Sequence, residues 1–269
     1  MRTPRLAGLG LAATAAVAFA VTGCTADGNA TPAASAPAAD TPSASASAGN
    51  ADPAAAAALA KAAAALGTTS FKITVTSGPG LTVTGLMDAP NGVGTANLVA
   101  TGPNTEINVK TLLVGQDLYV QIPGVTKGGT WTHLDVSRLP EGANVGLRPG
   151  QIDPANTARL LTSTTDVRQV DSRGYQGTLD LTKAAGVAGV DQTLVKTWGA
   201  QAQNVPFTAG LDEQGRLSAL TIQLPAVNGQ QAQPLEVLYT DYGIKVEAQK
   251  PAAGETTEAP DSLYTSLGG

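Results

Sequence analysis

Apolar and polar residues alternate along a series of short segments in the middle of the chain, and turn residues separate these segments. Phe71, Ile73 and Val75, for example, are separated by single polar residues, and Asn91-Gly92 follows the next such segment. A repeat of two residues is typical of a strand with one buried face, and Asn-Gly is favoured in two-residue hairpin turns. Because a parallel connection needs about a dozen residues or more, links this short predict an antiparallel sheet.

The same pattern predicts many strands and few helices. Strands are expected near residues 71–76, 81–87, 96–100, 107–113, 118–122, 131–136, 165–170, 175–181, 205–211, 216–224 and 235–242. Helices are expected over 54–66, from Asp153 to about 162, and within 181–202. Asp52 and Asp153 each precede a proline, which is typical of a helix start. Many antiparallel strands with separate clusters of helices indicate an α+β fold, in which one large sheet carries helices on one face.

The residues expected to face inward are mostly Val, Ile, Leu and Ala. Such an interior is either a closely packed core or an apolar cavity that holds a ligand. For a cavity, alternation selects seven candidate lining residues: Phe71, Ile73, Val75, Leu118, Val120, Leu220 and Ile222. The inward face of the segment 216–224 stays open at this point, because Leu217 and Ala219 alternate with Leu220 and Ile222.

The first residues have the layout of an export signal. Arg2 and Arg5 precede an uncharged run over 6–21, which is short for a membrane-spanning helix of about 20 residues. The run ends in Val21-Thr22-Gly23-Cys24, and small residues before a cysteine resemble a bacterial lipobox. This resemblance implies cleavage of a signal peptide 1–23, a diacylglycerol thioether on Cys24 and a fatty acyl chain such as palmitate on the new N-terminus. Two or more acyl chains hold a protein stably on a membrane, so we expect a lipid anchor at the extracytoplasmic face of the cell membrane. The alternative is an ordinary signal peptide with an incidental cysteine.

Polar segments flank the expected domain. Residues 24–51 are mainly Ala, Ser, Thr and Pro, which cannot bury enough apolar surface to offset the entropy of ordering. We therefore expect a flexible tether over 24–51 and one folded domain over 52–250. Residues 251–269 have a similar bias and are expected to form a flexible tail. In the alternative, the tail docks through its apolar side chains Leu263, Tyr264 and Leu267.

Charge and motif content argue against several functions. The chain of 269 residues carries a formal net charge of −5, which argues against binding to nucleic acid. It has one cysteine and one histidine, and it lacks the common catalytic, nucleotide-binding and zinc-protease motifs. We therefore expect no enzyme, no metal site and no cofactor. His133 and Asp135 share one face of a strand and could form a general-base pair, although a spacing of two brings such side chains together for structural reasons alone.

Several motifs occur in an order that is typical of one lipoprotein family. They are LVGQDLYVQIP at 113–123, GTWTHLD at 129–135, YQGTLDL at 175–181 and the segment 205–217, which begins VPF and ends DEQGRL. Together with the lipobox, the tether and the alanine-rich helix, they resemble the actinobacterial LppX/LprA/LprF/LprG-type lipoproteins. The resemblance spans roughly residues 60–245 and depends on the order and spacing of the motifs.

This resemblance implies a LolA/LolB-like fold, in which a strongly curved antiparallel sheet, or half-barrel, is covered by helices on its concave face. It also implies a hydrophobic cavity that binds acyl chains, and transport of lipid or lipoglycan across the cell envelope. The implied partners are the membrane, an acyl lipid or glycolipid, and an envelope lipid exporter. The alternative is an envelope-anchored interaction or sensing module with a closed core. An exported hydrolase is a more distant alternative, which would need a catalytic pair in a cleft.

Overall fold

The computed structural model describes residues 52–124, 126, 128–139, 147–150, 152–184, 192–226 and 233–266. All of them belong to one unit, Ala48–Gly269. The expected signal peptide, Cys24 and the tether lie outside the described residues and stay predictions.

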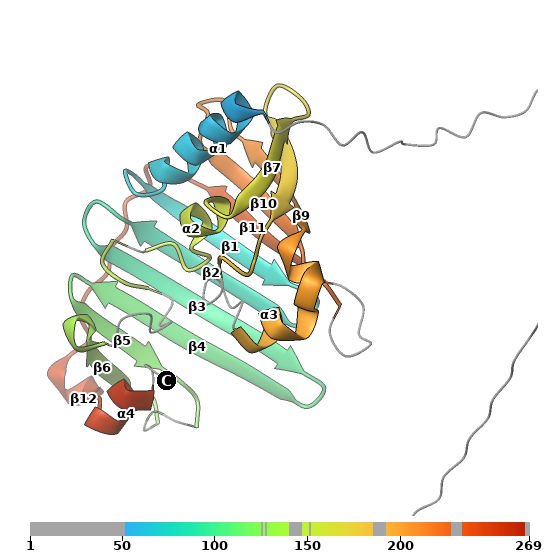
Figure 1. Cartoon of the computed structure of the whole chain (residues 1–269). Coiled ribbons are helices and arrows are strands. Elements are labelled where there is room, and N and C mark those ends of the chain that lie inside the picture. Colours follow the sequence, from blue (N-terminus) through green and yellow to red (C-terminus); the bar gives the residue numbers. More distant parts are fainter. Residues whose placement is uncertain are drawn as a thin grey trace, which may run out of the picture. The chain divides into compact units, whose positions relative to one another are not determined.

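The described residues form one sheet of twelve strands (Figure 1). The strands are β1 (Ser70–Ser77), β2 (Leu81–Asp88), β3 (Val93–Gly102), β4 (Thr105–Val114), β5 (Asp117–Gln121), β6 (Trp131–Asp135), β7 (Thr164–Gln169), β8 (Gly174–Leu179), β9 (Val205–Leu211), β10 (Leu217–Gln223), β11 (Pro234–Thr240) and β12 (Thr256–Glu258). Their order across the sheet is β12-β6-β5-β4-β3-β2-β1-β11-β10-β9-β8-β7. Each pair of neighbours is antiparallel except β12 and β6, which are parallel. The prediction of an α+β fold with one large, mostly antiparallel sheet is confirmed.

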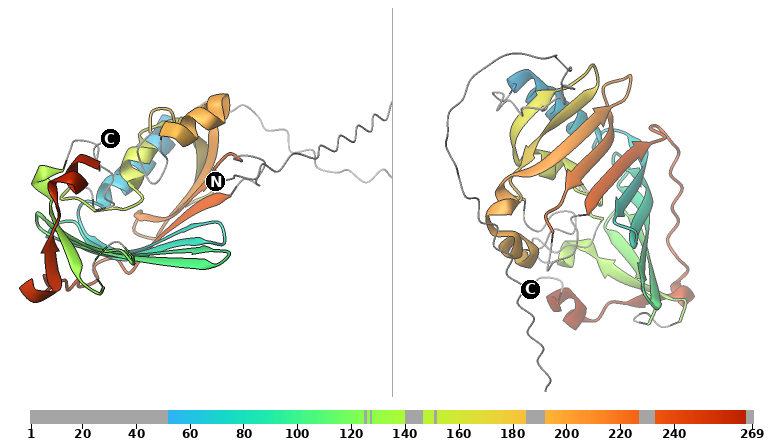
Figure 2. Two further views of the ribbon diagram at one scale, coloured as in Figure 1. Left: turned by 90° about the horizontal axis from the view of Figure 1, so that it is seen from below. Right: turned by 90° about the vertical axis from the view of Figure 1, so that its right-hand side faces the viewer.

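Three of the helices lie on the concave side of this sheet (Figures 1 and 2). They are α1 (Pro53–Ala65), α2 (Thr157–Leu161) and α3 (Gln192–Trp198), and the 3-10 helix η2 (Gly199–Gln203) follows α3. Helix α1 begins as expected, with Pro53 at its start and the Asp52 carboxylate accepting a hydrogen bond from Ala54 N at 2.9 Å. Its alanine-rich buried side includes Leu59, which is 1% exposed, so α1 packs closely over the sheet.

The helix expected from Asp153 begins later, at Thr157. Asp153 does accept backbone bonds, from Ala155 N and Thr157 N, both at 2.9 Å. However, Asn156 has a φ of +50°, and this left-handed conformation interrupts a helix. Of the helical region expected within 181–202, the described part contains α3 and most of η2, whereas the region around Gly186 and Gly189 lies outside the described residues.

Residues 251–266 are not the flexible tail that their composition predicts. After the 3-10 helix η3 (Ala253–Glu255), β12 pairs with β6, and the helix α4 (Asp261–Ser266) follows. The buried Tyr264 accepts a hydrogen bond from Asp135 N at 2.8 Å. The guanidinium of Arg138, at the end of the 3-10 helix η1 (Val136–Arg138), lies 4.1 Å from the centroid of the Tyr264 ring and donates to Asp261 Oδ1 at 2.6 Å. Backbone pairing with the edge strand and burial of one aromatic ring oppose the entropy of this polar segment.

Candidate functional site

The strand register defines the residues that share the concave face of the sheet. Directly opposed residues in an antiparallel pair point to the same side. From β1 toward β6, they form four rows. The first row is Phe71, Met87, Gly94, Leu113, Leu118 and Leu134; the second is Ile73, Gly85, Ala96, Thr111, Val120 and Thr132; the third is Val75, Val83, Leu98 and Val109; and the fourth is Ser77, Leu81, Ala100 and Ile107. Five of the seven predicted lining residues therefore lie on this face.

The other two, Leu220 and Ile222, also lie on the concave face. Leu220 opposes Val237 of β11, which in turn opposes Val75 of β1. Ile222 follows Leu220 by two residues and points to the same side. Leu217 is buried as well, because the register of β10 shifts after it and an irregularity of this kind re-aims a side chain. This shift resolves the ambiguity that alternation leaves in the segment 216–224.

The rows differ in how completely they are covered. Every residue of the first row is buried, and Phe71 and Leu118 are 0% exposed. In the third and fourth rows, the apolar residues of β2–β4 are partly exposed, and Ile107 reaches 43%. We define these six residues as the open patch: Leu81, Val83, Leu98, Ala100, Ile107 and Val109. The concave face is thus filled at one end of the strands and open at the other.

A segment that alternation does not detect fills the covered end. The buried side chains of Leu147 and Ile152 lie over β3. A Cβ added at Gly94 would be 3.5 Å from Leu147 Cδ1 and 3.4 Å from Ile152 Cγ2. Gly94 therefore leaves the space into which these two side chains pack.

Because of this packing, most of the predicted lining residues are part of the core and do not line a cavity. Six of the seven belong to the continuous hydrophobic core, and only Val120 is partly exposed. Alternation marks the residues of the open patch as inward, but it does not distinguish them from core residues. The pattern of one strand carries no information about which part of its face is covered by other segments.

A polar cluster ties α2 to the sheet beneath it. The Tyr239 hydroxyl donates to Asp153 Oδ2 at 2.8 Å and lies 2.5 Å from Thr157 Oγ1. Burial raises the pKa of the Asp153 carboxyl, although hydrogen bonds from Thr157, Tyr239 and Ala155 act in the opposite direction. Burial also raises the pKa of Tyr239 well above its ordinary value. The Tyr239 ring meets Phe71 edge to face, with centroids 5.5 Å apart, so the cluster joins the hydrophobic core.

His133 lies on the convex face and does not pair with Asp135. Its Nε2 lies 2.8 Å from Asp117 Oδ1, and its Nδ1 lies 2.8 Å from Glu258 Oε1. Partial burial lowers the pKa of His133, but the hydrogen bonds and charges of Glu258 and Asp117 outweigh it and raise that pKa overall. Asp135 instead accepts bonds from the backbone and hydroxyl of Ser137 at 2.9 and 2.6 Å. Both ring nitrogens of His133 are therefore occupied by carboxylates, which is the arrangement of an ion-pair cluster.

Within the described residues, no group of three or more His, Cys, Asp and Glu side chains is placed to hold a metal ion. No helix in this part of the chain is long and apolar enough to cross a membrane. No protein-family model matches the chain, and no curated protein matches it.

Proposed function

We propose that this protein is an exported lipoprotein, anchored to the cell membrane through Cys24, whose folded domain binds lipid acyl chains against the open patch. In this proposal the tether over 24–51 lets the domain carry lipid or lipoglycan across the cell envelope. The observation that supports it is the partly exposed apolar surface of the third and fourth rows on the concave face. Contiguous exposed apolar patches on soluble domains mark binding sites.

The chemistry of the open patch suits an acyl chain. All six of its side chains are aliphatic, and burial of each CH₂ group contributes about 0.8 kcal/mol. The neighbouring residues of the same rows on β1 are Val75 and Ser77, neither of which carries a charge. An extended hydrocarbon chain on this surface would displace water without leaving a charged group unpaired.

The fold is compatible with the half-barrel that the family resemblance implies, because the curved sheet carries its helices on the concave side (Figure 2). Because the first row is filled, we propose that the site lies at the opposite end of strands β2–β4. This end adjoins the β1–β2 turn and the β3–β4 turn, and it carries Leu81, Ala100 and Ile107.

The same packing favours the second candidate, an envelope-anchored interaction or sensing module without lipid cargo. Six of the seven residues selected as a cavity lining are packed in the core, as a closed interior requires. The two candidates differ in what should occupy the open patch: an acyl chain in the first, and a protein partner in the second.

Native mass spectrometry distinguishes them. The mature chain with Cys24→Ser is purified gently, and lipids are extracted from the same sample. We expect an acyl lipid at about one molecule per chain, as for a single apolar site. A mass without lipid, and no uptake of added phospholipid or triacylglycerol, would contradict lipid carriage and support the interaction module.

Two matched variants locate the site. Ile107 in the open patch is 43% exposed, and Leu238 on the opposite face of the sheet is 48% exposed. Ile107→Asp should abolish lipid retention because it places a charge against the acyl chain, whereas Leu238→Asp should retain the lipid. Equal lipid retention by both variants would show that acyl chains do not bind at the open patch.

A further inference from the structure

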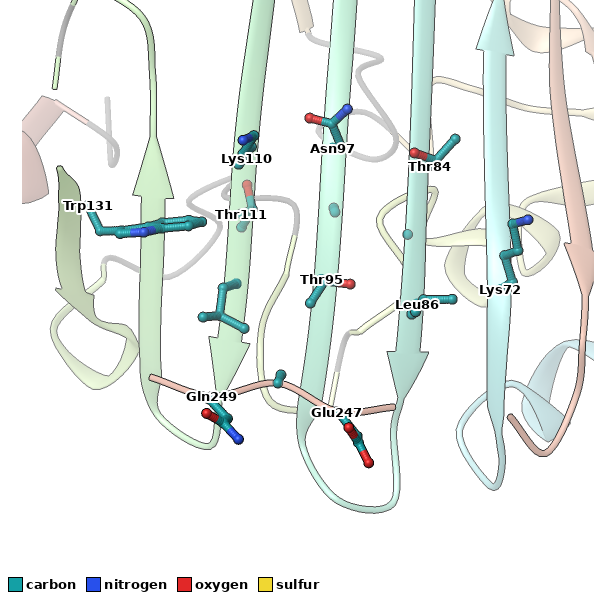
Figure 3. Close-up of a pocket in the computed structure, with 14 residues that line it drawn as sticks. Lys72, Thr84, Leu86, Thr95, Asn97, Lys110, Thr111, Trp131, Glu247 and Gln249 are labelled. Atoms are coloured by element: carbon teal, nitrogen blue, oxygen red, sulfur yellow. The ribbon is translucent and has the colours of Figure 1, made fainter. Parts of the chain in front are cut away.

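The convex face carries a groove that the proposed lipid site does not use. Its volume is about 490 Å³, which is within the range of about 300–1,000 Å³ that is usual for ligand pockets. The outer faces of β1–β4 form its floor, Trp131 of β6 closes one end, and residues 247–249 cross over it (Figure 3). We define residues 243–250 as the C-terminal strap, which runs along the convex side of the sheet (Figure 2).

The strap is attached to the sheet at both ends. At one end, Gly243 N donates to Ser70 O at 2.8 Å, and Ser70 Oγ donates to Ile244 O at 2.6 Å. At the other end, Lys250 Nζ donates to Asp117 Oδ2 at 2.5 Å. Beyond Lys250 the chain continues into β12, which is paired with β6.

The groove offers a flat apolar surface at one end. The ring of Trp131 projects from β6 across β5 toward β4, the strand that carries Lys110 (Figure 3). Trp131 is partly exposed, unlike Trp198, which is buried. An indole face packs well against the apolar face of another ring.

Two cations and the Asn97 side chain lie along the rest of the groove, beside the apolar side chains of Leu86 and Leu112. Lys72 and Lys110 are exposed, and neither forms an ion pair with a carboxylate of the described residues. Asn97 lies directly opposite Lys110, and its side chain also lines the groove. The carboxylate on the strap, Glu247, is paired with Lys245 at 2.6 Å, so the uncompensated charge of the groove is positive.

The groove extends across several strands of the sheet. Trp131 on β6 and Lys72 on β1 are separated by five strand-to-strand steps, which amounts to about 24 Å at the usual spacing of strands. A ligand that reaches both must be an extended chain that crosses the strands.

We propose that this groove binds an acidic oligosaccharide. One sugar ring stacks its C–H face on Trp131, hydroxyl groups lie against the Asn97 side chain, and acidic substituents lie near Lys110 and Lys72. A bare acyl chain would leave the two ammonium groups without partners. This site is independent of the lipid proposal, because it lies on the other face of the sheet.

Fluorescence titration tests the proposal in the mature chain with Cys24→Ser. Trp198→Phe leaves Trp131 as the only indole, since the chain has two tryptophans. The probes are tetragalacturonate, the neutral maltotetraose, and tetraglutamate as an acidic peptide. We expect tetragalacturonate to change the Trp131 emission and to bind about tenfold or more tightly than either comparator, a ratio that corresponds to about 1.4 kcal/mol.

Variants then assign the contacts. In the chain with both tryptophans, followed by calorimetry, Trp131→Ala should weaken tetragalacturonate about tenfold or more. Lys110→Gln should weaken tetragalacturonate and leave the weak binding of maltotetraose unchanged. Lys61→Gln, at an exposed lysine on α1, is the matched control for loss of one positive charge and should not weaken binding.

Three results would overturn the proposal. They are no binding of tetragalacturonate at millimolar concentration, equal affinity for tetraglutamate, and equal effects of Lys110→Gln and Lys61→Gln. The comparison of Lys110→Gln with Lys61→Gln does not require Trp131→Ala to fold. Both lysines are exposed, so neither substitution disturbs the core.

Discussion

Nε2 of His133 lies 2.8 Å from Oδ1 of Asp117, so an ion-pair cluster connects β6 to the first residue of β5. Oδ2 of the same carboxylate accepts the bond from Lys250, and Nδ1 of His133 faces Glu258 of β12. The Tyr119 ring stacks on the imidazole, with centroids 5.0 Å apart. This cluster fastens the strap and β12 to the edge of the sheet.

We predict that raising the pH above about 6.5 loosens the C-terminal segment, because folded His133 loses its charge as the pH rises through its raised pKa. The pKa of folded His133 is raised above its ordinary value of about 6.5, so the folded state binds the proton more tightly than the unfolded state. The stabilisation is complete below about pH 6.5 and is lost as the pH rises through the folded pKa. The backbone amide of Ala259 donates to His133 O at 2.9 Å. As the pH rises, its hydrogen exchange should become faster relative to exchange at a core amide.

The matched variant for this pH effect is His133→Gln, which keeps a hydrogen-bonding side chain but does not titrate. Its Ala259 amide should exchange rapidly at all pH values in the range. If the variant kept the pH dependence of the unmodified chain, another group would be responsible.

We expect Tyr239→Phe to lower the free energy of unfolding by about 1–3 kcal/mol, because it removes a donor from a buried acceptor. The hydroxyl that is lost bonds Asp153 Oδ2 and Thr157 Oγ1. Tyr175→Phe is the control, since Tyr175 is also buried but its hydroxyl forms no hydrogen bond within the described residues. Urea unfolding of the two variants measures the difference, and equal losses would contradict a specific role for the Asp153 cluster.

We expect Gly85→Ala to destabilise the domain by about 1–3 kcal/mol, as overpacked cores do. A Cβ at this position would be 2.4 Å from Met87 Cε and 2.5 Å from the backbone oxygen of Thr95. The Met87 side chain can move, but the carbonyl of β3 is fixed by the sheet. Gly128→Ala, where a Cβ would meet nothing within 4 Å, is the control for the loss of glycine. Thermal unfolding compares them, and equal midpoints would show that the sheet adapts at Gly85.

Cys24→Ser should release the full chain from the membrane when it is exported by a bacterial host. The proposed anchor carries two or more acyl chains, which hold a protein stably, whereas a protein without them has no comparable affinity. Membrane fractionation and the intact mass of the exported protein check this. A Cys24→Ser protein that stays in the membrane fraction would contradict a lipid anchor at this residue.

The turn chemistry and the alternation of the sequence predict most of the sheet correctly. Asn91-Gly92 lies in the turn between β2 and β3, with Gly92 at a φ of +64°. The residues Phe71, Ile73 and Val75 point to one face because successive side chains of a strand alternate. Such features depend on neighbours in the chain, which the sequence displays directly.

Alternation and turn residues could not predict how much of the concave face is covered. Leu147 and Ile152 cover Gly94 although more than fifty residues separate them in sequence, and Leu217 faces inward only because β10 shifts its register. Alternation therefore found the inward residues but not the boundary between the packed core and the open patch. The convex groove was missed for the same reason, since its Trp131, Asn97 and Lys72 come from three strands and its cover from the strap.

The sequence by itself determined the class of fold, the antiparallel hairpins and the side of each strand that is apolar, because period-two patterning and turn residues act over a few bonds. Only the tertiary structure decided how much of that apolar face is covered, that residues 251–266 dock on β6, and that a groove crosses the convex face. These outcomes depend on contacts between segments far apart in the chain, such as Ile152 with Gly94 and β12 with β6, which no local pattern records.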